Sequence, residues 1–126
     1  MTPSVLVVDD EQMTRNLLRL MLERTGFEIL EAEDGLKALL MVAEHAPDVL
    51  VLDVMMPHMD GFAVCKALRN QIETADIPII LLSARTSADF IQRGLDAGAN
   101  RYLGKPIGRD ELIRTLREVL QGIPAS

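Results

Sequence analysis

Residues 49–53 read Val-Leu-Val-Leu-Asp, four consecutive apolar residues that end in a carboxylate. A short, continuous run of Val and Leu is typical of a strand buried on both faces of a parallel sheet. Similar runs recur at residues 5–8, 27–30, 77–82 and, more weakly, 102–103. The sequence therefore predicts five buried strands.

The segments that follow these runs carry apolar residues at helical spacing, which predicts one helix after each strand. The first helix has a stripe at Met13, Leu17, Leu20 and Met21. The last has a stripe at Leu112, Ile113, Leu116, Val119 and Leu120. Helices are also expected near 36–45, 62–70 and 88–97, with capping residues at Asp34, Asp60 and Thr86 or Ser87.

This order of strand and helix, repeated five times, requires right-handed crossovers and a parallel sheet covered on both faces. Five such units in 126 residues predict one α/β domain. Its architecture is a three-layer, doubly wound (βα)5 flavodoxin-like sandwich with strand order 2-1-3-4-5. Within residues 1–126, the core is expected over 4–120, and 121–126 are interpreted as a tail or the start of a linker.

Composition narrows the classes of function. The net charge is -6 and aromatic residues make up 3%, so direct nucleic-acid binding by this domain is not expected. A single Cys excludes an internal disulfide framework and fits a reducing compartment. No apolar run approaches the ~18–20 residues that cross a bilayer, and the N-terminus lacks a basic-then-apolar leader. We therefore expect a cytoplasmic location without membrane contact.

Charged residues gather where the predicted strands end, which is where open α/β sheets bind ligands. The first strand ends in Asp9 and Asp10, and the neighbouring third strand ends in Asp53. Three carboxylates in one pocket repel one another, and a hard cation such as Mg²⁺ relieves that repulsion. Ser83 and Lys105 end the fourth and fifth strands. Cation, ammonium and hydroxyl would together surround a phosphoryl group, for which an Asp can be the nucleophile.

Five stretches give the chain a specific resemblance to receiver domains of two-component response regulators, the CheY-like superfamily. They are Val7-Val8-Asp9-Asp10-Glu11, Asp53-Val54-Met55-Met56-Pro57-His58-Met59-Asp60-Gly61, Leu82-Ser83-Ala84, Gly98-Ala99-Asn100 and Tyr102-Leu103-Gly104-Lys105-Pro106. The match covers residues 4–120, and the order and spacing of the stretches make it specific.

The resemblance implies a role for each matching residue. Asp53 would be the phosphoacceptor, taking a phosphoryl group from a sensor histidine kinase or a phosphotransfer protein. The reaction would need Mg²⁺, with Mn²⁺ as a substitute. Asp10 and Asp53 would ligate the metal directly, Met55 through its backbone carbonyl, and Asp9 mainly through water. Lys105 would pair with the phosphoryl group.

The resemblance also implies a switch. Ser83 would move towards the phosphoryl group and Tyr102 would turn inward, altering the face formed by the fourth helix, fifth strand and fifth helix. That face would control an output domain or effector protein, or form a phosphorylation-dependent homodimer. Of Phe90, Ile91 and Leu95, we interpret at least two as core residues and expect the remainder to shape this face.

Other residues have plainer interpretations. The resemblance implies that Pro106 follows a cis peptide bond, which is tolerated before proline. We interpret His58 as a solvated loop residue, in preference to a metal ligand or proton-transfer group. Cys65 and the Met residues are interpreted as core filling. Asn100 stands where relatives often have an acid, and we attach no consequence to it.

Three alternatives to a signalling switch stay open. A Mg²⁺-dependent phosphatase with an aspartyl-phosphate intermediate usually has a second acid where this chain has Met55. A flavin carrier would need a Ser/Thr-rich phosphate loop, but Asp9-Asp10-Glu11 occupies that position. A phosphorylation-independent, receiver-like adaptor would not need the complete set of acids and lysine. We therefore interpret the chain as a switch that catalyses only its own phosphorylation and dephosphorylation, and not as an enzyme.

Overall fold

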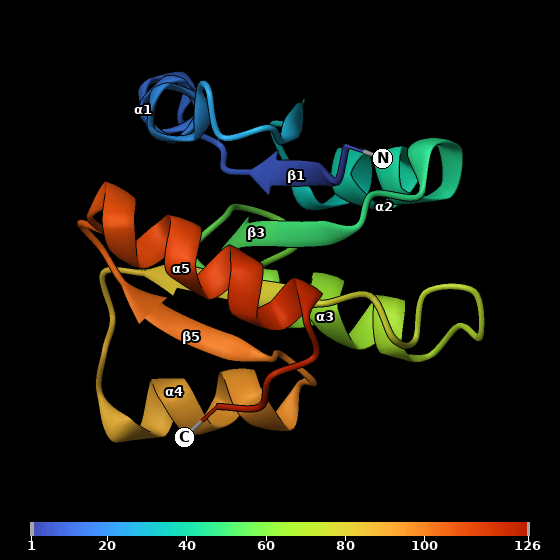
Figure 1. Ribbon diagram of the computed structural model, residues 1–126. Coiled ribbons are helices and arrows are strands. Elements are labelled where there is room, and N and C mark those ends of the chain that lie inside the picture. The colour runs from blue at the N-terminus through green and yellow to red at the C-terminus, as the bar shows by residue number, and fades with distance from the viewer. Residues whose placement is uncertain (1, 126) are drawn as a thin grey trace.

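The central sheet holds five parallel strands in the order β2-β1-β3-β4-β5, in a computed structural model that describes residues 2–125 (Figure 1). The strands are β1 (Ser4–Val8), β2 (Glu28–Ala32), β3 (Val49–Asp53), β4 (Ile79–Ser83) and β5 (Arg101–Gly104). The helices are α1 (Gln12–Leu22), α2 (Gly35–His45), α3 (Gly61–Arg69), α4 (Ala88–Asp96) and α5 (Arg109–Leu120). The predicted fold class and strand order are confirmed. Residues 1 and 126 of the predicted domain lie outside the described residues.

The sheet separates two hydrophobic cores because successive side chains of a strand point to opposite faces. Leu50 and Leu52 of β3 belong to the core that α2 and α3 complete. Val49 and Val51 of the same strand belong to the core that α1 and α5 complete. Burial on both faces explains why β3 consists of apolar residues up to Asp53. The predicted stripe of the last helix is confirmed as the buried face of α5, with Leu120 partly buried.

The predicted stripe of the first helix is wrong for three of its four residues, while Met21 is partly buried and packs against the core. Met13, Leu17 and Leu20 are all more than half exposed, Met13 to 83%. The buried face of α1 instead carries Leu18 and Leu22, together with a charged residue described below. Leu and Met residues lie on several sides of this helix, so periodicity alone does not select the side that packs on the sheet.

The predicted strand ends shift by one or two residues. β2 runs from Glu28 to Ala32, so it begins one residue and ends two residues later than the apolar run 27–30, and Glu31 lies inside it. β4 begins at Ile79 because Pro78 has no backbone N–H to donate to a ladder. None of the helices within residues 2–125 is long and apolar enough to cross a membrane.

Two of the predicted N-caps begin helices, α2 and α3, close to the carboxyl ends of the strands. Asp34 accepts a hydrogen bond from the Lys37 N–H and Asp60 from the Ala63 N–H, as expected for N-caps. Ser87, not Thr86, caps α4 through the Phe90 N–H. Gly61 opens α3, and a Cβ there would lie only 2.5 Å from the Asp53 carbonyl oxygen. Only a glycine therefore allows α3 to start this close to the end of β3.

Candidate functional site

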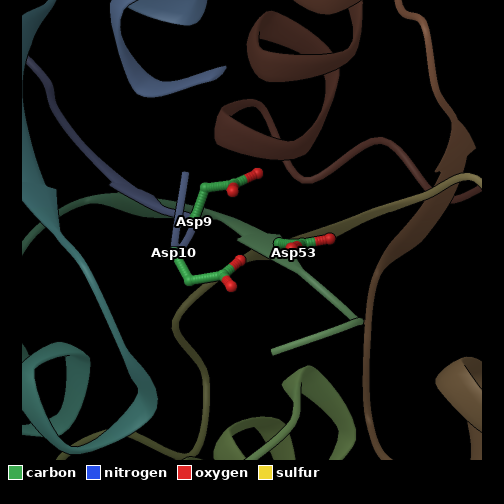
Figure 2. A group of neighbouring side chains, drawn as sticks. All are labelled: Asp9, Asp10 and Asp53. Carbon is green, nitrogen blue, oxygen red and sulfur yellow. The ribbon is translucent and has the colours of Figure 1, made fainter. Parts of the chain in front are cut away.

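Three carboxylates meet at the carboxyl ends of β1 and β3. One ligand oxygen of each of Asp9, Asp10 and Asp53 lies within 4.8 Å of the others (Figure 2). They converge because β1 and β3 pair in parallel, with Val8 opposite Leu52, so both strands end at the same level. Asp9 and Asp53 are buried, whereas Asp10 is exposed.

Asp9 is held through all of its polar groups. Its N–H donates to the Ala32 carbonyl at 3.2 Å, and its own carbonyl accepts from Arg15 Nη1 at 2.6 Å. Its Oδ1 accepts from the Glu11 N–H at 2.9 Å, and its Oδ2 from Lys105 Nζ at 2.9 Å. Both carboxylate oxygens of Asp9 therefore already have protein donors.

Asp53 is 5% exposed and only partly paired. Its Oδ1 accepts from Lys105 Nζ at 3.2 Å and from the Met55 N–H at 3.4 Å. Within residues 2–125, no donor contacts Asp53 Oδ2. Burial, followed by the charge of Asp9, raises the pKa of Asp53 to about 6, although Lys105 opposes the shift.

Lys105 is the cation of the site. Burial by itself lowers the pKa of this ammonium group, but the hydrogen bond to Asp9 and the charges of Asp53 and Asp9 outweigh burial, and the pKa is raised. Lys105 therefore stays protonated and neutralises part of the carboxylate charge. The predicted cis peptide bond between Lys105 and Pro106 is confirmed.

Asp10 differs from the other two acids. Its carboxylate is exposed and makes no hydrogen bond or ion pair with any residue of the described range 2–125. Three carboxylates face a single ammonium, so the cluster keeps a negative charge and offers only oxygen ligands. Such a donor set fits a hard divalent cation such as Mg²⁺.

Ser83 lies at the end of β4, the strand between β3 and β5, and is completely buried. Its Oγ accepts from the Arg85 N–H at 3.0 Å, and its carbonyl accepts from the Lys105 N–H at 2.9 Å. Ser83 therefore joins the strand that carries Lys105 to the loop before α4.

Tyr102 is tied to the same loop. Its hydroxyl donates to the Arg85 carbonyl. Its ring lies against α4 at Gly94, where a Cβ would come within 2.7 Å of Tyr102 Cδ2. The loop after β4 thus contacts both Ser83 and Tyr102 through Arg85.

The expectation that at least two of Phe90, Ile91 and Leu95 are core residues is wrong. Phe90 and Ile91 are only partly buried, and Leu95 is 41% exposed. The only buried residue of α4 is Gly94, because this helix covers the edge of the sheet at β5. The face near Tyr102 consequently presents apolar side chains to solvent.

Three further residues have clear surroundings. His58 is exposed in the loop after Asp53, with φ of 69°. Cys65 is buried, which confirms it as core filling, whereas Met13 and Met55 are exposed, so the same interpretation is wrong for these two methionines. Asn100 has a structural role that sequence analysis missed. Its Oδ1 accepts hydrogen bonds from the Ile79 N–H at 2.8 Å and from Arg69 Nη2 at 3.1 Å.

Residues 5–117 match the family described as response regulator receiver domain. The chain is 46% identical over 121 residues to response regulator MprA of Mycobacterium bovis, an alignment that covers 96% of this chain and 52% of that protein. MprA of Mycobacterium ulcerans gives the same identity, with 51% covered. The chain therefore spans about half the length of these curated relatives.

Solved structures agree with this result. Chemotaxis protein CheY4 of Vibrio cholerae superposes with a TM-score of 0.89 at 36% identity, covering 94% of this chain and 99% of that chain. The receiver domain of Francisella response regulator 1452 superposes with a TM-score of 0.88 at 36% identity, covering 95% and 98%.

Proposed function

Because the chain belongs to the response regulator receiver domain family, we propose that it is a phosphoacceptor switch with Asp53 as the acceptor. The donor would be a phosphohistidine on a sensor histidine kinase or a phosphotransfer protein. The observation that carries the proposal is the state of Asp53, a buried carboxylate with one oxygen bound to Lys105 and the other free of donors among residues 2–125. Such an oxygen can attack phosphorus.

The transfer step needs no reagent besides the phosphohistidine donor and a proton from solvent. As the bond from an Asp53 oxygen to phosphorus forms, the bond from phosphorus to the donor imidazole nitrogen breaks, and the imidazole takes its proton from solvent. Phosphoryl transfer depends mainly on in-line placement and charge neutralisation. Lys105 supplies one positive charge beside Asp53. Mg²⁺, or Mn²⁺ in its place, would supply the rest when bound.

The three acids divide the work of holding that cation. Asp10 is exposed and without a protein partner in residues 2–125, which supports it as a direct ligand. Both oxygens of Asp9 already accept hydrogen bonds, which supports a contact mainly through water. Asp53 would add one carboxylate oxygen while the other attacks phosphorus, and Met55, whose N–H contacts Asp53, its backbone carbonyl.

Phosphorylation would switch the loop that follows β4. A phosphoryl group adds roughly two negative charges and new acceptor oxygens. Ser83 would turn its hydroxyl towards them and release the Arg85 N–H that it now binds. Because the Arg85 carbonyl holds Tyr102, the change would reach the face formed by α4, β5 and α5. We assign control of an output domain, an effector protein or a second copy of the chain to this face.

Intact mass after incubation with acetyl phosphate tests the proposal. We expect one added phosphoryl group on the wild type with Mg²⁺, none without a divalent cation, and none on Asp53→Asn. Asp60→Asn is the matched control, because Asp60 caps α3 and is not among the clustered carboxylates. An adduct on Asp53→Asn, or no adduct on the wild type with Mg²⁺, would contradict the proposal. Steady release of phosphate from a general phosphate ester would favour the phosphatase instead.

A further inference from the structure

The buried face of α1 carries one charged residue, Arg15, beside Leu18 and Leu22. Arg15 is 9% exposed. Arginine is almost never buried to this extent unless its guanidinium is paired. Its partners therefore explain why the helix tolerates it.

The guanidinium of Arg15 joins three segments of the chain. Nη1 donates to the Asp9 carbonyl at 2.6 Å, Nε to Glu31 Oε1 at 3.1 Å, and Nη2 to Gln12 Oε1 at 2.6 Å. These acceptors lie after β1, in β2 and at the start of α1. The rigid fork of arginine donors suits this arrangement, whereas a lysine could not reach all three acceptors at once.

The contact with Asp9 has a direct consequence for the acidic cluster. The Asp9 carbonyl belongs to the peptide unit that joins Asp9 to Asp10. Among residues 2–125, only Arg15 donates to that oxygen. The Asp10 carboxylate has no protein partner of its own in this range, so the orientation of the peptide unit decides where it lies.

We propose that Arg15 is a positioning residue that fixes the peptide unit between Asp9 and Asp10 and so sets the geometry in which Asp10 binds the cation. The inference rests on the proposed function, because it concerns the same cation site. Arg15 touches neither the phosphoryl group nor the cation in this account. It acts through Asp9 and Asp10.

Arg19 provides a matched control one turn further along α1. It binds the other oxygen of Glu31, with Nη2 at 2.7 Å from Oε2, and its side chain is 43% exposed. Its further contact is with the Ile29 carbonyl, away from Asp9. Arg15→Gln and Arg19→Gln therefore both lose an ion pair with Glu31, but only Arg15→Gln loses the bond to Asp9.

Titration of backbone amide resonances with Mg²⁺ tests the proposal. We expect Arg15→Gln to weaken Mg²⁺ binding by roughly 10-fold, which is typical for loss of a group that orients a metal ligand. The Mg²⁺ affinity of Arg19→Gln should stay within about 2-fold of the wild-type value, because this substitution removes the ion pair with Glu31 but no contact with Asp9. Arg15→Lys keeps the positive charge but only one donor nitrogen, and its Mg²⁺ affinity should lie between those of the wild type and Arg15→Gln. It also serves as the test variant if Arg15→Gln does not fold.

A second readout needs no metal. In cation-free protein, the amide resonance of Asp10 reports the hydrogen bond to the Asp9 carbonyl. We expect this resonance to shift in Arg15→Gln but not in Arg19→Gln. Folded Arg15→Gln with unchanged Mg²⁺ affinity and an unchanged Asp10 amide would overturn the proposal, as would equal weakening in Arg19→Gln. If the wild type binds no Mg²⁺, the proposed function is wrong, and the Asp10 amide still decides whether Arg15 orients the segment.

Discussion

The Nζ of Lys105 lies 3.2 Å from Oδ1 of Asp53, although a whole strand separates their positions in the sheet. Lys105 follows β5 and Asp53 ends β3, with β4 between them. The lysine side chain spans β4 where that strand ends in Ser83. One ammonium group thereby connects the ends of non-adjacent strands and holds the buried carboxylates together.

Because the pKa of Asp53 is raised in the native state, ionisation of this carboxyl group lowers the free energy of unfolding. Between the ordinary value of 3.8 and the native value of about 6, the native state binds more protons than the unfolded state. The free energy of unfolding therefore falls as pH rises through this window, and the full cost is present above about pH 6. Without divalent cations, we expect Asp53→Asn to be more stable than the wild type at about pH 8, by on the order of 1–3 kcal/mol.

Urea unfolding of both proteins at several pH values measures this effect. The difference between them should shrink as pH falls below about 6 and vanish near the pH at which both states protonate Asp53. Saturating Mg²⁺ should reduce the difference at high pH, because the cation stabilises the ionised carboxylates of the wild type alone. If the wild type were instead more stable than Asp53→Asn at high pH without Mg²⁺, the attraction of Lys105 would outweigh the cost of burying the ionised carboxylate.

Lys105 and a divalent cation compete for the same negative charge. We expect Lys105→Gln to bind Mg²⁺ several-fold more tightly than the wild type, because the acids lose the one ammonium group that pairs with them within the described residues. The yield of phosphorylated protein from acetyl phosphate should fall, since one charge that stabilises transfer is gone. Calorimetric titration and intact mass provide the two readouts. Lys37→Gln, on the exposed side of α2, is the control and should change neither.

The contact between Tyr102 and Gly94 can be tested with one methyl group. A Cβ at position 94 would overlap the Tyr102 ring and also lie 2.9 Å from Leu81 Cδ1. We expect Gly94→Ala to lower the free energy of unfolding by about 1–2 kcal/mol, because the overlap outweighs the gain in helix propensity. The Tyr102 resonances should shift, and the amides after β4 should exchange faster. Gly108→Ala, with open space around its Cβ, should cost about 0.5 kcal/mol at most and leave Tyr102 unchanged.

Cys65 should be chemically silent in the native protein. It is buried in α3, and burial raises the pKa of its thiol. The reactive thiolate is therefore scarce and shielded from reagents. We expect no reaction with an aromatic disulfide reagent at about pH 8 in the folded state and complete reaction in denaturant. Rapid labelling of the folded protein would indicate that α3 opens locally.

The positions of the strand-end residues could be predicted because a single local pattern, an apolar run, indicates both where a strand lies and which residue ends it. An apolar run such as 49–52 places its strand inside the sheet, and the residue that ends it, Asp53, must then lie at the ligand-binding edge. The same reasoning brought Asp9, Asp10 and Lys105 to this edge, where the three carboxylates cluster and Lys105 pairs with Asp9 and Asp53.

Residues with distant partners could not be predicted in the same way. Arg15 can be buried because Glu31 and the Asp9 carbonyl accept hydrogen bonds from its guanidinium. Nothing in the local sequence of α1 indicates those partners. The burial of the α1 face and the partial exposure of Phe90 likewise depend on which neighbouring elements cover each helix. One signal was available, since Arg15 shares a helical face with Leu18 and Leu22 while Glu31 is a charge within a strand.

The most direct test of the central claim locates the phosphoryl group among the clustered carboxylates. The chain is phosphorylated with acetyl phosphate and Mg²⁺, reduced with borohydride so that an aspartyl-phosphate becomes homoserine, digested, and sequenced by mass spectrometry. If Asp53 is the phosphoacceptor, homoserine appears at position 53 and unmodified aspartate remains at positions 9 and 10. Homoserine at Asp9 or Asp10, with Asp53 intact in protein that carries a phosphoryl group, would contradict it.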